Sequence, residues 1–335
     1  MTTKTNQAYK IIVIGGAGFI GSHMVKYLSL KGNEVITFDN LVTGYSNAVC
    51  YGKLVVGDLS DQKQLQELFK KNRCDAVFHF ASSIEVGESV INPSKYYLNN
   101  VINTINLLEA MRSAEVNKII FSSTAAIFGE PEYLPIDENH NKKPINTYGK
   151  TKWMVENILE DYDNAYGLKY CSFRYFNAAG ADSQTELGER HYPESHLIPL
   201  ILQVASGRKP EIKLFGKDYK TPDGTCIRDY IHVEDLCSAH WLGLEQLMHG
   251  GKSDTYNLGN GKGYSVQQVI HAVEKVTNKA IKVIETERRK GDPDKLIASS
   301  EKAKSKLGWV PKYSNLETMI EHAWQWEISS KFDKK

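Results

Sequence analysis

A tyrosine and a lysine four residues apart form the most reactive pattern in the sequence. Tyr148 and Lys152 begin a segment with helical spacing, where residues i and i+4 share one face. A phenol with a reference pKa of about 10 is a poor base at neutral pH, but a nearby ammonium favours its phenolate. Such a tyrosine can take a proton from an alcohol while hydride leaves the carbon. The run Ser122-Ser-Thr124, which ends the preceding predicted strand, supplies a hydroxyl for a proton relay.

A glycine-rich loop near the N-terminus predicts a dinucleotide site. Gly15, Gly18 and Gly21 follow the apolar strand 11–14 and open a segment with helical spacing, so that backbone N–H groups can approach a pyrophosphate. The next strand, 34–39, ends in Asp39, where an acid would bind the adenosine ribose. Because a carboxylate accepts hydrogen bonds from a free 2′-hydroxyl and repels a 2′-phosphate, Asp39 favours NAD over NADP.

Short apolar runs alternate with helical segments along the first half of the chain. We expect strands at 11–14, 34–39, 54–58, 75–80, 118–122 and 169–174, and helices at 61–72, 94–112 and 148–166. This alternation indicates a parallel sheet with helices on both faces, whose ligands bind at the carboxyl ends of the strands. The predicted fold class is α/β: a Rossmann-type doubly wound parallel sheet with a smaller, interleaved α/β C-terminal substrate domain.

The polar stretch 181–193 marks the predicted change of domain. We assign 9–180 to an NAD-binding domain, with a return to its sheet at about 230–260 through a strand at Tyr230, a helix and a second strand at 255–259. Residues 181–229 and 261–330 would bind the substrate. Ser265 and Gln268 have capping-box spacing and predict a helix to about Thr277, followed by a strand at 281–284 and helices at 300–307 and 316–328.

The composition excludes several classes of partner. With 41 Lys+Arg against 40 Asp+Glu, the net charge of +1 gives no strong field for nucleic acid or an anionic membrane, so local cations must hold any anionic ligand. The five cysteines form no Cys-x-x-Cys pair, which predicts a reduced protein without a zinc site. The first apolar run breaks at Gly15, too early for a signal peptide or a membrane span, so we expect a cytoplasmic protein.

Taken together, these motifs resemble the extended short-chain dehydrogenase/reductase family, and within it the UDP-glucose 4-epimerases. The glycine loop, Ser122-Ser-Thr124, the Tyr148/Lys152 pair and the stretch 174–181 carry the first resemblance. The stretches 214–233 and 288–292 carry the second, and the similarity extends over nearly the whole chain. The resemblance implies a redox-neutral inversion at C4 of a UDP-hexose. Hydride would pass from C4 to bound NAD as Tyr148 takes the O4 proton, and would return to the opposite face after the 4-keto sugar turns about its diphosphate link.

The same resemblance assigns roles residue by residue. Tyr148 would be the catalytic base, Thr124 its hydroxyl partner, and Lys152 would hold the nicotinamide ribose and lower the pKa of the tyrosine. Residues expected at the cofactor are Gly15, Gly18, Phe19, Ile20, Gly21, Asp39, Asn40, Asp58, Leu59, Phe80, Ala81, Asn99, Ser122, Tyr148, Lys152, Tyr175 and Phe176. Residues expected at the substrate are Thr124, Tyr148, Asn177, His196, Leu197, Leu214, Phe215, Arg228, Arg289, Asp292 and Leu296, and no metal ligand is expected.

Arginines among these residues suit a diphosphate, because a planar guanidinium binds phosphate bidentately. By resemblance, Arg228, Arg289 and Asp292 would hold the diphosphate and the uridine ribose, and His196 would meet the nucleotide through backbone. Leu296 would line the wall beside the sugar C2 group, where a tyrosine restricts some epimerases to glucose and galactose. Leucine leaves room for an N-acetyl group, so we expect UDP-N-acetylglucosamine and UDP-N-acetylgalactosamine to be substrates as well.

Three other functions can be compared with these residues. A sugar-nucleotide 4,6-dehydratase needs an acid pair where this chain has Ala125 and Ala126. A UDP-glucuronate 4-epimerase would differ only around C6 and stays open, whereas the intact reactive residues disfavour a non-catalytic NAD-binding regulator.

By resemblance, helices 94–112 and 148–166 would form a homodimer. Its apolar contacts could come from residues that could equally face the sheet, namely Val101, Ile105, Leu108, Met154, Ile158 and Tyr162.

Overall fold

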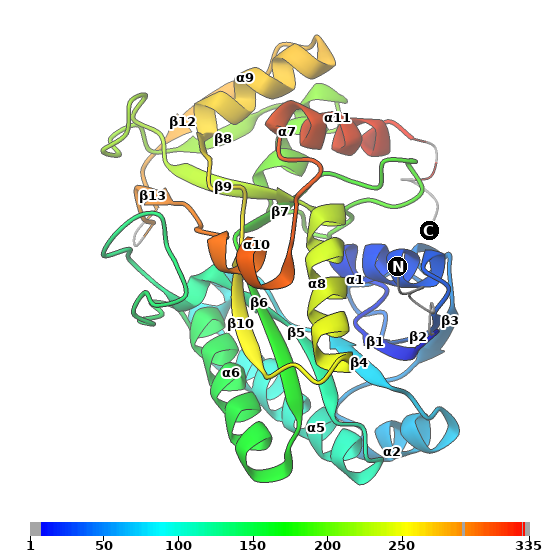
Figure 1. Cartoon of the computed structure of the whole chain (residues 1–335). Helices are drawn as coiled ribbons and strands as arrows, with labels where there is room; N and C mark the ends of the chain where they lie inside the picture. Colours follow the sequence, from blue (N-terminus) through cyan, green and yellow to red (C-terminus); the bar gives the residue numbers. More distant parts are fainter. Residues whose placement is uncertain (1–7, 290–291, 330, 332–335) are drawn as a thin grey trace, which may run out of the picture.

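A parallel sheet of seven strands forms the centre of this computed structural model, which describes residues 8–289, 292–329 and 331. The strand order is β10-β6-β5-β4-β1-β2-β3 (Figure 1). These strands are β1 (Lys10–Ile14), β2 (Glu34–Asp39), β3 (Lys53–Val56), β4 (Ala76–His79), β5 (Lys118–Thr124), β6 (Lys169–Tyr175) and β10 (Asp254–Leu258). The predicted doubly wound α/β class is confirmed. Residues 290 and 291 of the stretch 288–292 lie outside the described part of the chain.

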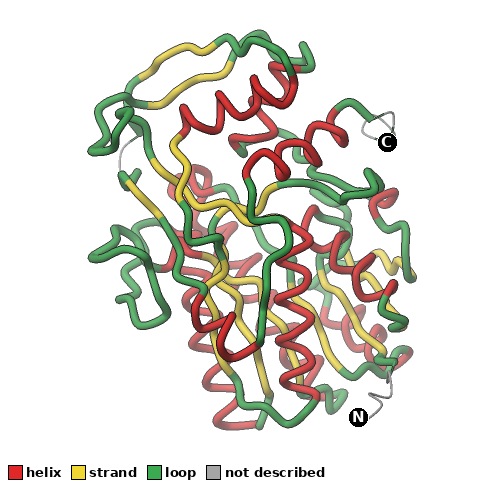
Figure 2. The backbone as a smooth tube through the Cα atoms, turned by 45° about the horizontal axis from the view of Figure 1, so that its top comes forward, coloured by secondary structure: helices red, strands yellow, loops and turns green. Residues whose placement is uncertain are grey.

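Helices cover both faces of this sheet, because successive side chains along its strands are buried in opposite cores. In β1, Ile11 and Val13 pack into a core under α1 (Phe19–Leu30) and α8 (Val233–Met248). Ile12 and Ile14 point to the opposite core, which α2 (Gln62–Lys71), α5 (Asn103–Ser113) and α6 (Thr147–Tyr166) cover. Figure 2 shows the strands between these helices. Each such aliphatic side chain stabilises the fold by roughly 1.5–3 kcal/mol when fully buried.

The segment predicted as one helix at 94–112 contains a π-helical stretch. The chain passes through α3 (Val86–Ile91), which was not predicted, and α4 (Pro93–Tyr96) into the π-helix η2 (Tyr97–Ile102) before α5 begins. Two asparagines of η2 bind the loop after β4: Asn99 Nδ2 donates to Ser83 Oγ at 3.1 Å, and Asn100 Oδ1 accepts from the Ser83 N–H at 2.8 Å. Because π-helical turns are rare and often lie at functional sites, this stretch marks the loop as part of the site.

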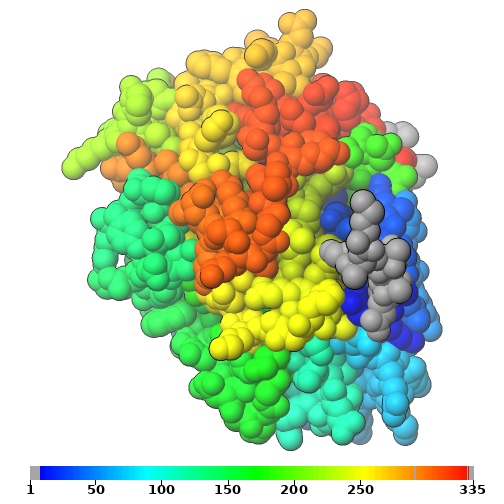
Figure 3. All heavy atoms as spheres, in the orientation of Figure 1, coloured from blue at the N-terminus to red at the C-terminus, as the bar shows by residue number. Residues whose placement is uncertain are grey.

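The second half of the chain builds two smaller sheets. β7 (Asn177–Ala179) follows β6 directly and pairs with β9 (Ile227–His232), which also pairs with β11 (Gly263–Ser265) and β13 (Lys295–Leu296). β8 (Ile212–Phe215) pairs with β12 (Val283–Thr286). A third core lies among α7 (Leu197–Ala205), α9 (Val266–Thr277) and α11 (Leu316–Glu327). α10 (Glu301–Leu307) instead packs on α8 and β10, and Figure 3 shows this orange segment against yellow residues.

Sequence patterns located these elements better than they assigned their partners. The Ser265/Gln268 capping box is present and opens α9. β10 extends the large sheet beside β6, but β9, which was predicted to accompany it, belongs to the second sheet because it pairs in parallel with β7. The strand predicted at 281–284 lies at 283–286, and its partner β8 was not predicted.

Asp229, in the middle of β9, fastens two loops to the second sheet. Its carboxylate is fully buried and accepts hydrogen bonds from the backbone N–H groups of Asn260 (2.9 Å), Gly261 (3.0 Å) and Ala298 (3.0 Å). A buried N–H group that loses its acceptor costs about 1–3 kcal/mol. The position of the loops on either side of Arg228 and Leu296 therefore depends on this one carboxylate.

We expect Asp229→Ala to lower the free energy of unfolding by about 1–3 kcal/mol, because the buried Ala298 N–H loses its acceptor and two partly buried donors lose theirs with it. Urea denaturation of the parent and the variant measures this loss. Asp161→Ala, at an exposed position of α6, is the control and should leave the midpoint nearly unchanged. Equal midpoints for all three proteins would contradict the role of Asp229.

Candidate active site

The glycine loop is packed so closely that two of its glycines admit no side chain. Gly15 has φ +77°, and a Cβ there would lie 2.5 Å from the Ala81 nitrogen. A Cβ on Gly21 would lie 2.1 Å from the Gly15 oxygen, because the first turn of α1 rests on the loop. The loop thus joins the carboxyl ends of β1 and β4, with Phe80 and Ala81 half-buried beside it.

The acid at the end of β2 supports the same loop. Asp39 is buried, and its Oδ2 accepts from the Ala17 N–H at 2.9 Å. Asn40 follows it and donates from Nδ2 to Asp58 Oδ2 at 2.7 Å, and this hydrogen bond is the main cause of the lowered pKa of Asp58. Leu59 is buried in the core, so only its backbone can face a ligand.

A cleft of about 730 Å³ opens beside the loop, which is within the range of about 300–1,000 Å³ typical of ligand sites. Gly18 and Phe19 line one side, and Tyr45, beside the short helix η1 (Ser46–Ala48), lines another together with Arg190. The Arg190 guanidinium stacks 4.1 Å from the centre of the Tyr45 ring. Ile20 lies behind this wall and packs on the core. The tight loop, the acid and the cleft fit a dinucleotide.

The reactive tyrosine and lysine lie on the face of α6 that packs on β5. Asn146 caps this helix, with Oδ1 accepting from the Gly149 N–H at 2.8 Å. Lys152 is 2% exposed, and its Nζ donates to the Ser122 carbonyl oxygen at 2.8 Å while lying 6.0 Å from the centre of the Tyr148 ring. The predicted shared face is therefore present.

Thr124 lies at the end of β5 and joins the tyrosine in a chain of hydrogen bonds. It caps the short helix η3 (Ala125–Ile127), with Oγ1 accepting from the Ala126 N–H at 3.1 Å. The same side chain hydrogen-bonds to Tyr148 and lowers the pKa of the phenol. The backbone donor leaves the threonine hydroxyl proton free to point at the phenol oxygen, as a proton relay requires.

Burial shifts the pKa values of both reactive groups. Desolvation raises the pKa of Tyr148 to about 12 against the smaller lowering by Thr124, and lowers that of Lys152 to about 7 although Glu156 acts to raise it. In the protein alone the tyrosine pKa is therefore raised, whereas the sequence predicted that the lysine would lower it. The reason is that both side chains lose solvation in the same dry site.

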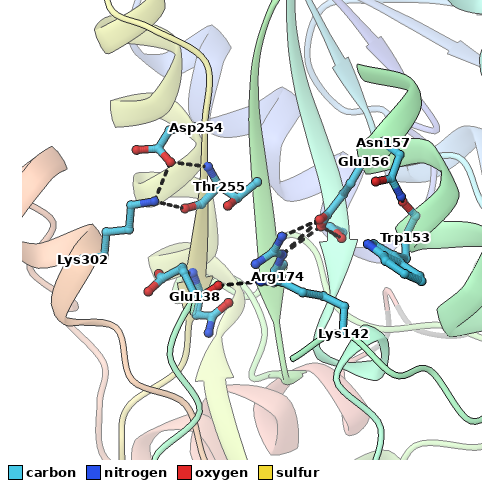
Figure 4. Close-up of polar contacts among 11 residues, drawn as sticks. Glu138, Lys142, Trp153, Glu156, Asn157, Arg174, Asp254, Thr255 and Lys302 are labelled. Atoms are coloured by element: carbon cyan, nitrogen blue, oxygen red, sulfur yellow. Dashed lines mark hydrogen bonds and ion pairs between the residues drawn. The ribbon is translucent and has the colours of Figure 1, made fainter. Parts of the chain in front are cut away.

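A buried ion pair lies behind these residues, and the sequence gave no signal for it. Glu156, one turn after Lys152, binds Arg174 of β6 through two parallel contacts, Nε–Oε1 at 2.9 Å and Nη2–Oε2 at 2.6 Å. The same carboxylate accepts from the Ser123 hydroxyl of β5. Figure 4 shows Arg174 and Glu156 pointing at one another from adjacent elements. The packing of α6 on β5 and β6 brings these two residues together.

The residues after Arg174 face the space beside the tyrosine. Tyr175 OH makes a very short hydrogen bond with Ser122 Oγ, and burial raises the pKa of Tyr175. Phe176 and Leu296 both pack against a small apolar cluster that includes Ala125. Leu296 therefore lies near the end of β5, although it comes from β13.

Four predicted substrate residues gather around the outer end of β9. Arg228 pairs with Asp292, and the Arg289 guanidinium stacks 3.9 Å from the centre of the Phe215 ring. Sequence reasoning missed Tyr219, whose OH donates to Asp292 Oδ2 at 3.0 Å. Its place within 214–233 was the only available signal.

The remaining predicted substrate residues lie in different environments. Asn177 lies at the start of β7, and its Nδ2 donates to the Asp229 carbonyl oxygen at 2.8 Å. Leu214 is 2% exposed in the third core, so its side chain cannot touch a substrate, and Leu197 packs on that core. The His196 side chain points to acidic neighbours, which leaves its backbone for a nucleotide.

The sequence pattern that defines the NAD dependent epimerase/dehydratase family matches residues 11–259. The chain belongs to that family.

Relatives cover nearly the full chain. A protein of Halalkalibacterium halodurans named UDP-glucose 4-epimerase is 52% identical over 94% of this chain and 95% of its own. The crystal structure of UDP-glucose 4-epimerase from Brucella ovis in complex with NAD has a TM-score of 0.93 and 48% identity, covering 95% of this chain and 98% of that one. The structure of the UDP-Glc/GlcNAc 4-epimerase from Campylobacter jejuni has a TM-score of 0.83 and 43% identity, with coverages of 95% and 98%. Among the described residues of this chain, no helix has the length and apolarity needed to cross a membrane.

The lowered pKa of Lys152 predicts a pH-dependent stability. The pKa falls from 10.5 to about 7, so between these values the unfolded chain binds more protons and native stability rises with pH. Lys152→Met removes this titration. We expect the difference in melting temperature, variant minus parent, to be largest near neutral pH. This difference should decrease as the pH approaches 10.5, the reference pKa of lysine.

Thermal melts across that range, at equal NAD occupancy, measure the effect. Lys150→Met, at an exposed position two residues away, is the matched control and should differ from the parent by the same amount at every pH. A Lys152→Met curve parallel to that of the parent would show that the lysine titrates normally in the folded protein.

Proposed function

We propose that this protein catalyses the NAD-dependent inversion of C4 in UDP-hexoses and interconverts UDP-glucose with UDP-galactose. The observation that carries the proposal is the chain of hydrogen bonds from Ala126 N–H through Thr124 to Tyr148, beside the glycine loop, in a chain about half identical to named UDP-glucose 4-epimerases. Ala125 and Ala126, which follow Thr124, carry no acid for a dehydratase.

Tyr148 is the residue that moves the O4 proton. Its phenolate accepts the proton while the Thr124 hydroxyl donates to the same oxygen and stabilises its negative charge. Lys152, held at the Ser122 carbonyl, adds a positive charge on the same face of α6. Bound NAD would supply the hydride acceptor and donor for C4, and the positive charge of its oxidised ring would favour the Tyr148 phenolate further.

Arg228 and Arg289 anchor the other end of the substrate. Both guanidinium groups are oriented, one by Asp292 and one by the Phe215 ring, so little side-chain entropy is lost when they bind a diphosphate. Anchoring at this end leaves the hexose free to turn between its two orientations.

The proposal extends to the organisation of the chain. Residues 9–180, with the return at 230–260 that contributes β10, hold the cofactor, and 181–229 with 261–330 hold the UDP-sugar. All five cysteines are free thiols, which supports a cytoplasmic location.

Tyr148→Phe should reduce kcat for UDP-galactose by about 10²–10⁴-fold, because it removes the general base and leaves the ring in place. Activity and bound NAD are measured on the same preparation, and we expect the NAD content to be unchanged. Tyr166→Phe, the same substitution at a site that is 58% exposed, is the control and should retain parental activity. A Tyr148→Phe enzyme within a few-fold of the parent would rule out this tyrosine as the base.

We also propose that the enzyme accepts N-acetylated UDP-sugars. Leu296 is half-buried and packs against the cluster next to Thr124, together with Phe176. A leucine at this wall leaves more space than an aromatic ring, and the Campylobacter jejuni relative is itself described as a UDP-Glc/GlcNAc 4-epimerase.

Leu296→Tyr should lower kcat/KM for UDP-N-acetylgalactosamine by about one to two orders of magnitude, because a clash in a packed site costs roughly 1–3 kcal/mol. The value for UDP-galactose should change little. Leu296→Met keeps the volume and should leave both substrates as they were. A parent enzyme without turnover of UDP-N-acetylgalactosamine would refute the proposed breadth.

We further propose a homodimer through η2, α5 and α6, with contacts that differ in part from those predicted. Val101 and Leu108 are buried in the core of the protomer, and Ile105, Ile158 and Tyr162 pack partly against that core. Exposed apolar side chains on these helices include Met154 (42%), which was among the predicted contacts, and also Leu98 (58%), Ile102 (47%) and Trp153 (37%). An apolar group of this kind on adjacent helices is typical of an interface between copies.

Ile102→Glu should convert the dimer to a monomer at micromolar concentration, because a charge in an apolar contact is costly to desolvate. Sedimentation measures the change. Val310→Glu introduces the same charge at an 81% exposed site on another part of the chain and should leave the dimer intact. A parent protein that sediments as a monomer would refute the proposed assembly.

A further inference from the structure

Four side chains with metal-ligating atoms gather where the chain runs from β7 to α7. They are Glu189, His191, Glu194 and His196, and one ligand atom from each lies within 4.8 Å of all the others. All four fall within eight consecutive residues. The cysteine spacing predicted no zinc site, but the pattern Glu-x-His-x-x-Glu-x-His supplies nitrogen and oxygen ligands instead.

Ligand atoms of the four side chains lie close enough for one metal ion to reach all of them. His191 Nδ1 lies 3.2 Å from Glu189 Oε1 and 3.9 Å from Glu194 Oε2. His196 Nδ1 lies 2.9 Å from Glu189 Oε1 and 2.9 Å from Glu194 Oε1. Zinc binds nitrogen and oxygen at about 2.0–2.2 Å, which places the ligand atoms of a tetrahedron about 3.3–3.6 Å apart. The two separations from His191 lie near this spacing, whereas the two contacts of His196 at 2.9 Å are hydrogen bonds that would lengthen around an ion.

The protein supports this cluster from behind. The Glu189 and Glu194 side chains are only 8% and 5% exposed, and they line a small cavity of about 30 Å³ between α7 and α11 together with His191. The segment approaches α11 so closely that a Cβ on Gly188 would lie 2.2 Å from the Trp326 ring. The Trp326 Nε1–H also donates to the Glu189 carbonyl oxygen at 3.1 Å.

One ligand atom of the cluster lacks a hydrogen-bond partner. His191 Nδ1 is buried from solvent, and its contact with Glu189 at 3.2 Å does not have the geometry of a hydrogen bond. A buried ring nitrogen without a partner is costly, and a metal ion in the centre of the cluster would satisfy it.

We propose that Glu189, His191, Glu194 and His196 bind one Zn²⁺ ion. Two imidazole nitrogens and two carboxylate oxygens within 4.8 Å of one another favour zinc, whereas Mg²⁺ and Ca²⁺ take oxygen ligands alone in larger shells. The two carboxylates neutralise the charge of the ion, and the neutral imidazoles complete its coordination.

Four protein ligands leave no open coordination position, so the site is structural. The ion would hold the segment 189–196 in one conformation immediately before α7, whose first residue is Leu197. It would also fix Ser195, whose Oγ donates to Glu85 Oε1 at 2.9 Å in the loop after β4. Zinc would thereby lock the connection between the second domain and the loop beside the cofactor cleft.

Zinc titration of the intact enzyme after treatment with a chelator tests the proposal, with a chromophoric zinc chelator as competitor. We expect one tightly bound equivalent per chain. His191→Ala and Glu194→Gln should each weaken that binding by at least about 100-fold, whereas His249→Ala, at an exposed histidine of the same protein, should not change it. No tight equivalent in the parent, or equal loss in His249→Ala, would overturn the proposal.

X-ray absorption at the zinc edge of the parent enzyme provides a second readout that needs no variant. We expect a first shell of nitrogen and oxygen alone at about 2.0–2.1 Å, with imidazole scattering beyond it. Sulfur in the first shell would place the ion on the cysteines and overturn the assignment. A six-coordinate shell of oxygen at longer distance would overturn it as well.

Discussion

The buried ion pair between Glu156 and Arg174 is the constraint on which the active site depends. Both side chains are 6% exposed, and a bidentate contact fixes their relative orientation. Removing one partner of such a pair costs about 3–5 kcal/mol, because the other charge stays buried without compensation. The ion pair therefore holds α6 in a fixed position on β6.

The reactive residues lie on the same elements as Glu156 or as a residue that contacts it. Lys152 lies one helical turn before Glu156, and Tyr148 lies one turn before that. Thr124 follows Ser123, whose hydroxyl binds the Glu156 carboxylate. The ion pair thus fixes α6, which carries the phenol, against β6 and against β5, which carries the threonine hydroxyl, although it touches neither group. The Glu156 charge also opposes the effect of desolvation on Lys152, which keeps the pKa of that lysine from falling below about 7.

Features set by local sequence were predictable. The glycine loop, the acid that ends β2, the Tyr148/Lys152 face and the Ser265 capping box all depend on residues a few positions apart, where steric and hydrogen-bonding rules act directly.

Features set by packing between distant segments were not predictable. From the sequence, the side chains of Val101 and Leu108 could face either the sheet or a second copy of the chain. Only the packing of α2 and α6 around them places them in the core. The core position of Leu214 likewise depends on the helices that cover β8. Arg174 and Glu156 meet because α6 packs on β6, which no local pattern reveals.

Epimerisation of UDP-galactose that carries deuterium at C4, followed in ordinary water by NMR, tests the central claim most directly. If Tyr148 moves only the O4 proton and the cofactor carries the C4 hydride within the site, the UDP-glucose product retains its deuterium at C4. Replacement of that deuterium by solvent hydrogen during turnover would show that C4 itself is deprotonated, and would contradict the account.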